Sequence, residues 1–267
     1  MSTPSHPTAP GRDVVLIGAG EMGGVFARAF LRSGYAVHPV LRTTDPATVA
    51  ERVRDPAIVL VTVGEADLDA TLASLPPQWR DRLLLLQNEL LPRSWKAHGI
   101  EDPTVAVVWF EKKPGQDVKV IISSPVGGPR AGMVVDALAS IGIAAHVTTT
   151  DEDLEAELVA KNLYILTANI AGLETGGTVL EMWQGSNGLA NAVASDVLAI
   201  QEYLVGHVVD RDAAIDGMLA AIGGDPDHGT TGRSAPARLA RAIRHADDAG
   251  LEVATLRDLA ARYLPPS

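Results

Sequence analysis

The first half of the chain alternates short apolar runs with stretches in which apolar residues recur at helical spacing. The apolar runs have the length of strands and cover residues 14–17, 36–41, 58–63, 83–86, 105–110 and 118–122. They are mostly continuous, which is typical of strands buried on both faces of a parallel sheet. Helical spacing occurs between them, at residues 21–33, 46–54, 67–74 and 131–141. This alternation predicts βαβ units and therefore an α/β fold with a Rossmann-type parallel sheet.

The second half of the chain has a different pattern. Helical periodicity with few β-branched clusters covers residues 151–173, 187–208, 211–222, 234–249 and 256–263. We therefore predict an all-α C-terminal domain over residues 150–267 after a dinucleotide-binding domain over residues 12–149, because Thr150 or Asp151 can cap the incoming helix. Residues 1–11 are rich in Pro, Ser and Thr and are expected to form a disordered tail.

Composition removes several classes of function. The 22 Lys and Arg against 33 Asp and Glu give a net charge of −11, so we expect no binding to nucleic acid or to an anionic membrane surface. The apolar runs are far shorter than the roughly 20 residues of a membrane-spanning helix. The absence of cysteine excludes disulfides and thiolate metal sites and makes a cytoplasmic protein the expectation. The seven histidines are scattered without ligand spacing, so no metal site is predicted.

A glycine-rich turn directly follows the first predicted strand and opens the first predicted helix. It has the form G-x-G-x-x-G, in the residues Gly18, Ala19, Gly20, Glu21, Met22 and Gly23. The first glycine permits the tight turn, the second lets a pyrophosphate approach the backbone, and the third lets the helix pack close to the sheet. The helix N-terminus supplies N–H groups for the anion. The turn therefore predicts a dinucleotide cofactor.

The end of the second predicted strand decides which dinucleotide is expected. An Asp or Glu there would accept hydrogen bonds from a free ribose 2′-OH, but this chain has Arg42 followed by Thr43 and Thr44. A guanidinium with neighbouring hydroxyls suits a 2′-phosphate, so NADP(H) is the predicted cofactor. The alternative is that Arg42 is a solvated surface residue and Asp45 holds the ribose of NAD.

Further motifs extend the pattern beyond the cofactor turn. They are Leu86-Gln87-Asn88 after the fourth strand, Glu157-Leu158-Val159-Ala160-Lys161 in the first helix of the helical domain, and Asn169 later in that helix. Together with GAGxMG and the arginine closing the second strand, they resemble the ketopantoate reductase family over most of the chain. The resemblance implies that Asn88 lies beside the nicotinamide and the substrate, that Lys161 is the general acid that protonates the carbonyl, and that Asn169 helps to bind the substrate. A cation beside a developing alkoxide is chemically suited to that role.

Each of these residues also has a structural alternative. Glu157 precedes Lys161 by four residues, so the two side chains can form an ordinary ion pair on the helix surface. Asn88 can simply end a strand, and Asn169 can be a satisfied amide inside a helix. The arginines of the last third of the chain, namely Arg233, Arg238, Arg241 and Arg244, can bind an anionic partner or a substrate carboxylate, or remain solvated.

The chain departs from the family pattern at several positions. Glu89 stands where the family has a glycine after the asparagine, and Gly64-Glu65 stands where a lysine would follow the third strand. Ile165 replaces a further asparagine, and the C-terminal serine-rich motif with its substrate-binding glutamate is absent from residues 228–238. These departures leave the identity of the substrate open.

The function predicted from these features is NADP-dependent reduction of a small carbonyl compound, a 2-oxo acid or related ketone, with Lys161 as the proton donor. An imine or pyrroline-carboxylate reductase is the closest alternative, because a GAGxMG turn with a helical second domain also occurs there. A cofactor-binding protein without turnover is the alternative from another class. A homodimer is a further expectation, since the helical domain can also serve in dimerisation.

Overall fold

The computed structural model describes residues 11–265, without the Asn187 side chain, and shows two compact units. The tail predicted at residues 1–11 lies outside the described residues except for Gly11. Unit 1 consists of Met1–Gln87 and Ser94–Leu154, and unit 2 consists of Asn88–Arg93 and Glu155–Ser267. The division therefore falls between Leu154 and Glu155, a few residues beyond the predicted boundary, and places a short segment after the fourth strand in the helical unit.

Unit 1 is built around a sheet of seven strands. The strand order is β2-β1-β3-β4-β5-β8-β9, and every pairing except β5–β8 is parallel. The strands of this sheet are β1 (Asp13–Ile17), β2 (Ala36–Val40), β3 (Ile58–Val61), β4 (Leu83–Leu85), β5 (Thr104–Ala106), β8 (Ser124–Gly127) and β9 (Ala145–Val147). The predicted α/β class with a Rossmann-type sheet is confirmed.

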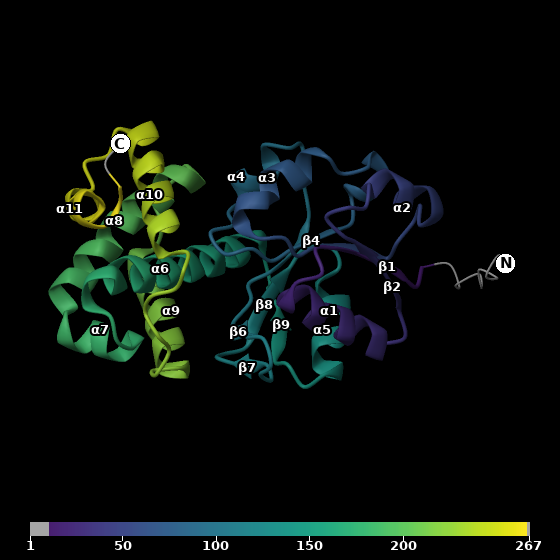
Figure 1. The fold of residues 1–267 in the computed structure, drawn as a ribbon, viewed down its shortest axis with the longest axis horizontal. Helices are drawn as coiled ribbons and strands as arrows, with labels where there is room; N and C mark the ends of the chain where they lie inside the picture. The colour runs from purple at the N-terminus through teal and green to yellow at the C-terminus, as the bar shows by residue number, and fades with distance from the viewer. Residues whose placement is uncertain (1–10, 266–267) are drawn as a thin grey trace. The chain divides into compact units, whose positions relative to one another are not determined.

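Helices cover both faces of this sheet. Figure 1 shows α1 and α5 on one face and α2 and α3 on the other. The helical elements are α1 (Glu21–Arg32), α2 (Pro46–Arg52), α3 (Glu65–Ala73), the 3-10 helix η1 (Pro77–Trp79), α4 (Pro92–Lys96) and α5 (Ala131–Ser140). Strand residues Val14, Ile58 and Leu84 are completely buried and pack with Phe26 and Phe30 of α1 in one apolar core. The continuous apolar strands thus follow from burial on both faces.

Two predicted strands of unit 1 differ from what the apolar pattern indicated. The run 105–110 divides into β5 and a separate β6 (Phe110–Glu111), which pairs antiparallel with β7 (Lys119–Val120). The run stays buried, but its backbone changes partners: the Trp109 amide donates to the Ser124 hydroxyl at 2.9 Å. The predicted strand 118–122 therefore joins this small hairpin, where β7 is exposed, and not the parallel sheet.

Unit 2 is all-α apart from an isolated β-bridge between Thr178 and Gly229, as the helical periodicity predicted. Its helices are α6 (Asp151–Thr175, whose first turn belongs to unit 1), α7 (Val179–Gly185), α8 (Asn187–Val205), α9 (Arg211–Gly224), α10 (Ala235–Ala249) and α11 (Ala254–Tyr263). Helix α7 was not predicted; Thr178 and Glu181 begin it with a reciprocal capping box. Gly206 and Gly250 end α8 and α10 in the left-handed conformation. Within the described residues, no helix is long and apolar enough to cross a membrane.

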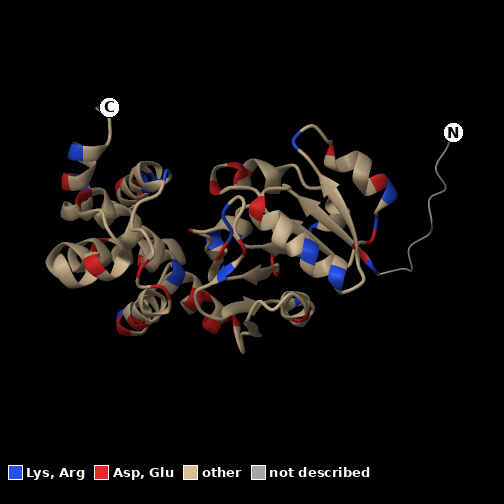
Figure 2. Cartoon of the chain, turned by 60° about the horizontal axis from the view of Figure 1, so that its bottom comes forward, with Lys and Arg blue, Asp and Glu red and all other residues tan. Residues whose placement is uncertain are grey.

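The segment Asn88–Arg93 contacts the helices of unit 2 through a hydrogen bond and a cation–π interaction. Asn162 of α6 donates from its amide nitrogen to the Leu90 carbonyl oxygen at 3.3 Å and to the Gln201 side-chain oxygen of α8 at 3.1 Å. The guanidinium of Arg93 lies 5.4 Å from the centre of the Tyr203 ring, a cation–π distance. Figure 2 shows acidic and basic residues interspersed along the helices of both units.

Candidate functional site

The glycine turn of unit 1 has the backbone geometry that the motif predicts. Gly18 has φ +92°, and a Cβ atom there would lie 3.1 Å from the backbone of Thr62 and Val63. A Cβ atom on Gly23 would lie 2.4 Å from the Gly18 carbonyl oxygen, so this glycine is needed for α1 to approach the turn. A Cβ atom on Gly20 would meet nothing within 4 Å, and no side chain caps the first turn of α1.

A cavity of about 780 Å³ opens beside this turn. It is lined by the turn residues Gly18, Ala19 and Gly20, by Arg42 at the end of β2, and by residues of α3 and of the segment before it. The side chain of Arg42 is 96% exposed, and its guanidinium lies 3.8 Å from the Asp67 carboxylate, which also lines the cavity. An open glycine face beside such a cavity fits a pyrophosphate, and the exposed Arg42 fits a negatively charged group at the far end of a dinucleotide.

The other residues predicted to bind the cofactor do not all line this cavity. Thr43 is exposed and does not line the cavity, whereas Thr44 does. Asp45 accepts a hydrogen bond from the Ala47 amide at 2.9 Å as the N-cap of α2 and does not line the cavity. Met22 packs against the core of unit 1. Glu21 forms an ion pair with Lys112 at 3.1 Å and lines a second cavity of about 390 Å³.

Two polar side chains that the motif did not include hold the turn in place. The Thr62 hydroxyl donates to the Ile17 carbonyl oxygen at 3.1 Å and also to that of Gly18. The Gln87 amide donates to the Val61 and Val63 carbonyl oxygens at 2.7 and 3.1 Å. Gln87 belongs to the motif Leu86-Gln87-Asn88, whereas no local pattern indicates Thr62, because its hydroxyl joins strand ends far apart in sequence.

In unit 2, Lys161 and Asn169 lie on one stripe of α6. They are eight residues apart, and only Ile165, midway between them, interrupts a run of buried residues from Leu158 to Ala171. Lys161 is 8% exposed, and its amino nitrogen lies 5.9 Å from the centre of the Tyr164 ring. Burial and the positive charge of Arg238 lower the pKa of Lys161 to about 7. The amino group can therefore gain and lose a proton near neutral pH.

Asn169 is held by two neighbours. Its side-chain oxygen accepts a hydrogen bond from Arg238 of α10 at 2.7 Å, and its amide nitrogen donates to the Thr230 carbonyl oxygen at 3.3 Å. Thr230 is itself tied to Gly177, to which both its amide and its hydroxyl donate. These contacts orient the carboxamide and bring Arg238 into the neighbourhood of Lys161 and Asn169.

Asn88 and Glu89 form a turn whose second residue is conformationally unusual. Asn88 is half-buried, and Glu89 has φ +62°, a conformation that favours glycine. The Glu89 carboxylate accepts hydrogen bonds from Arg238 at 2.9 Å and from Arg241 at 2.5 and 2.9 Å. From the sequence, Glu89 is only a departure from the family pattern, and Arg238 and Arg241 can bind an anionic partner or a substrate carboxylate, or remain solvated. The structure brings the three together.

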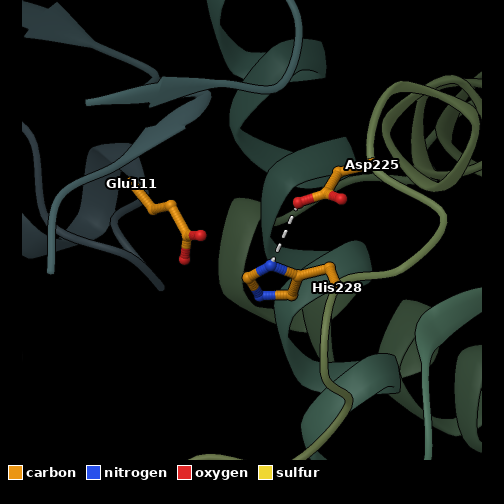
Figure 3. Close-up of side chains that lie close together, drawn as sticks. All are labelled: Glu111, Asp225 and His228. Atoms are coloured by element: carbon orange, nitrogen blue, oxygen red, sulfur yellow. Dashed lines mark ion pairs between the residues drawn. The ribbon is translucent and has the colours of Figure 1, made fainter. Parts of the chain in front are cut away.

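The loop before α10 carries a further ion pair, drawn in Figure 3. His228 Nδ1 lies 3.4 Å from the carboxylate of Asp225, which is 3% exposed. Glu111, the third residue in the view, belongs to unit 1, where it pairs with Lys113 at 3.1 Å. One carboxylate and one imidazole are fewer ligands than a protein metal site uses, so we assign no metal to this pair.

Comparison with known proteins gives matches in structure but not in sequence. No family model matches the chain, and no curated protein matches it. The 2-dehydropantoate 2-reductase of Methylococcus capsulatus has a TM-score of 0.66 at 14% identity, covering 94% of this chain and 95% of that one. The dimeric ketopantoate reductase of Staphylococcus aureus has a TM-score of 0.63 at 16% identity, covering 94% and 96%. D-mandelate dehydrogenase with NADH and anilino(oxo)acetate has a TM-score of 0.64 at 14% identity, covering 93% and 96%.

The chain therefore has the fold of these reductases and dehydrogenases, a Rossmann-type domain followed by an all-helical domain. The resemblance to ketopantoate reductases that the motifs suggested is confirmed at the level of the fold.

Because the pKa of Lys161 is lowered in the folded state, protonation of this lysine should reduce the free energy of unfolding as the pH falls. The unfolded side chain has a pKa of 10.5 and the folded one about 7, so the unfolded state binds more protons between these values. Relative to Lys161→Met, the free energy of unfolding of the wild type should rise by about 1.4 kcal/mol per pH unit from pH 7 to 10.5. Below pH 7 the variant should be more stable by up to about 5 kcal/mol.

Urea unfolding of both proteins at pH 6, 7.5 and 9 measures this difference. Lys96→Met is the control, because Lys96 is exposed and its replacement should give a difference that does not change with pH. A pH-independent difference for Lys161→Met as well would contradict the prediction.

Proposed function

We propose that the protein is an NADP-dependent reductase of a small carbonyl compound, a 2-oxo acid or related ketone, with Lys161 as the general acid. The observation that carries the proposal is the buried Lys161 amino group, with a pKa of about 7, on the same stripe of α6 as the oriented Asn169 carboxamide. A general acid works best when its pKa lies near the working pH, and a buried lysine in this fold meets that condition.

The residues of unit 1 would hold the cofactor. Gly20 leaves room for the pyrophosphate, the first turn of α1 offers backbone N–H groups, and Arg42 would bind the 2′-phosphate. Arg42 lines the cavity and Asp45 does not, which favours NADP(H) over NAD(H). The bound nicotinamide supplies the hydride.

The residues of unit 2 would bind and protonate the substrate. A protonated Lys161 stabilises the negative charge that grows on the carbonyl oxygen and then transfers a proton to it, leaving the neutral amine. Asn169, fixed by Arg238 and Thr230, orients the substrate, and Asn88 is assigned a similar role beside the nicotinamide.

Charge and the structural neighbours support a carboxylate-bearing substrate. Arg238 and Arg241 share one carboxylate, that of Glu89, so this part of unit 2 carries excess positive charge. D-mandelate dehydrogenase, which has the same fold, is described with NADH and anilino(oxo)acetate, an oxo acid.

The Staphylococcus aureus reductase is described as dimeric, which supports a homodimer for this chain as well.

Replacing Arg42 tests the cofactor assignment. Arg42→Ala removes a charged partner of the 2′-phosphate, so the dissociation constant of NADPH should rise by about tenfold or more, while that of NADH changes less than about twofold. Fluorescence titration with both cofactors measures the ratio. Arg52→Ala, an exposed arginine at the end of α2 outside the cavity lining, is the matched control. An unchanged ratio in Arg42→Ala would remove the assignment.

Replacing Lys161 tests the reductase chemistry. Lys161→Met should lower kcat for carbonyl reduction by at least about 100-fold, because the Met side chain has no proton to deliver, while NADPH binding stays at the wild-type level. The assay is NADPH oxidation with a panel of 2-oxo acids, ketopantoate included, and of ketones and cyclic imines. Turnover by Lys161→Met at the wild-type rate would exclude Lys161 as the acid. Turnover of cyclic imines only would favour an imine reductase.

A further inference from the structure

A buried chain of polar contacts in unit 2 links the turn after β4 to the stripe on α6. It runs from the Glu89 carboxylate to the Arg238 guanidinium, and from Arg238 to the Asn169 carboxamide, with separations of 2.9 and 2.7 Å. Arg238 and Asn169 are 8% and 9% exposed, and the Glu89 side chain is 16% exposed. A buried charged network of this kind must be fully satisfied to be tolerated, so its members hold one another in a single arrangement.

The backbone of Glu89 indicates that its side chain is needed. With φ at +62°, the residue occupies the left-handed region, where glycine would fit without cost and other residues cost about 1 kcal/mol or more. The carboxylate offsets this cost by accepting hydrogen bonds from both Arg238 and Arg241. A glycine would close the turn at no conformational cost, but it could not accept these hydrogen bonds from Arg238 and Arg241.

Arg238 occupies the central position in this chain. Its Nε–H donates to Glu89, and one of its terminal nitrogens donates to the Asn169 oxygen, so the planar guanidinium has a fixed orientation. Its charge also acts on Lys161, where it disfavours a second positive charge. The same side chain therefore binds Asn169 and acts through its charge on Lys161, the two residues to which the proposed function assigns the substrate chemistry.

We propose that Glu89 and Arg238 are positioning residues of the Lys161 site. Glu89 holds the Arg238 guanidinium, and Arg238 fixes the Asn169 carboxamide and contributes a positive charge near the Lys161 amino group. The inference rests on the proposed function for the role of Lys161 in turnover, but the contacts and the charge on Lys161 are properties of the free protein.

The groups around Lys161 come from several elements. Glu157 lies one turn earlier on α6, and Tyr164 presents its ring from the same helix. Arg238 comes from α10. It forms an ion pair with Glu89 of the segment Asn88–Arg93, and Arg241 of α10 pairs with the same carboxylate. Asn162, beside Lys161 in sequence, is engaged with neutral groups of α8 and of the segment.

The test is a direct titration of the Lys161 amino group. The chain has five lysines, namely Lys96, Lys112, Lys113, Lys119 and Lys161, so NMR of the full-length protein labelled with ¹³C at lysine Cε resolves few signals. Lys161→Met identifies the Lys161 signal. The protein needs neither cofactor nor substrate for this measurement.

Charge variants should move the titration midpoint of Lys161 in opposite directions. Arg238→Met removes a positive charge and should raise the midpoint by about one pH unit. Glu89→Gln removes a negative charge and should lower it. Arg238→Lys restores the charge and should return the midpoint close to that of the wild type. Arg211→Met, which breaks the exposed Arg211–Glu202 pair of the same unit, is the control and should leave the midpoint unchanged.

Turnover supplies the second readout. The alkaline limb of kcat for carbonyl reduction should shift with the NMR midpoint in each variant, and Arg238→Lys should recover the limb but not the full kcat, since it loses the fixed contact with Asn169. A purely structural role would lower the amount of folded protein without moving either value.

Midpoints that stay at the wild-type value in both Arg238→Met and Glu89→Gln, or that shift in the same direction, would overturn the inference. If Arg238→Met does not fold, the Lys161 midpoints of Glu89→Gln and Arg238→Lys test the inference by the same titration. Should the wild type reduce no carbonyl or imine, the proposed function fails, whereas opposite shifts of the Lys161 midpoint would still establish the positioning role of Glu89 and Arg238.

Discussion

Burial of one lysine amino group is the constraint on which the candidate site of the helical unit depends. A lysine that is 8% exposed loses most of its hydration, and its pKa falls to about 7 because the charged form is disfavoured there. A second cation, Arg238, lies close enough to add to this effect, and it is tolerated because Glu89 and Asn169 both accept its hydrogen bonds. Such a costly arrangement is typical of a chemical site and uncommon in a purely structural helix bundle.

The two units illustrate why some features of a fold can be predicted from sequence and others cannot. The glycine turn was predictable because its geometry is local: Gly18 needs a positive φ and Gly23 needs the absence of a Cβ atom, and the flanking strand and helix are visible in the apolar pattern. The hairpin of β6 and β7 was not predictable, since the backbone beyond Ala106 finds its partners at Ser124 and Ile121, which only the folded chain brings near.

The candidate site divides in the same way. Lys161 and Asn169 could be named as candidates because their motif lies within one helix, and Arg42 because it directly follows a predicted strand. Glu89 and Arg238 are 149 residues apart, and neither carries a local signal of the other. Glu89 replaces a glycine of the family pattern, and the acidic residue of the C-terminal motif is missing. In the structure, the carboxylate of Glu89 is bound by Arg238 and Arg241, a contact that the sequence alone does not indicate.

The transfer of a hydride from NADPH to a carbonyl carbon can be measured directly. The wild-type protein would be incubated with NADPH carrying two deuterium atoms at C4 of the nicotinamide, so that transfer from either face is labelled, and with a pooled panel of 2-oxo acids, ketones and cyclic imines. The products would be analysed by mass spectrometry. We expect a 2-hydroxy acid that has gained one deuterium on its former carbonyl carbon. Tight binding of NADPH without deuterium in any product would contradict a reductase and identify the chain as a cofactor-binding protein.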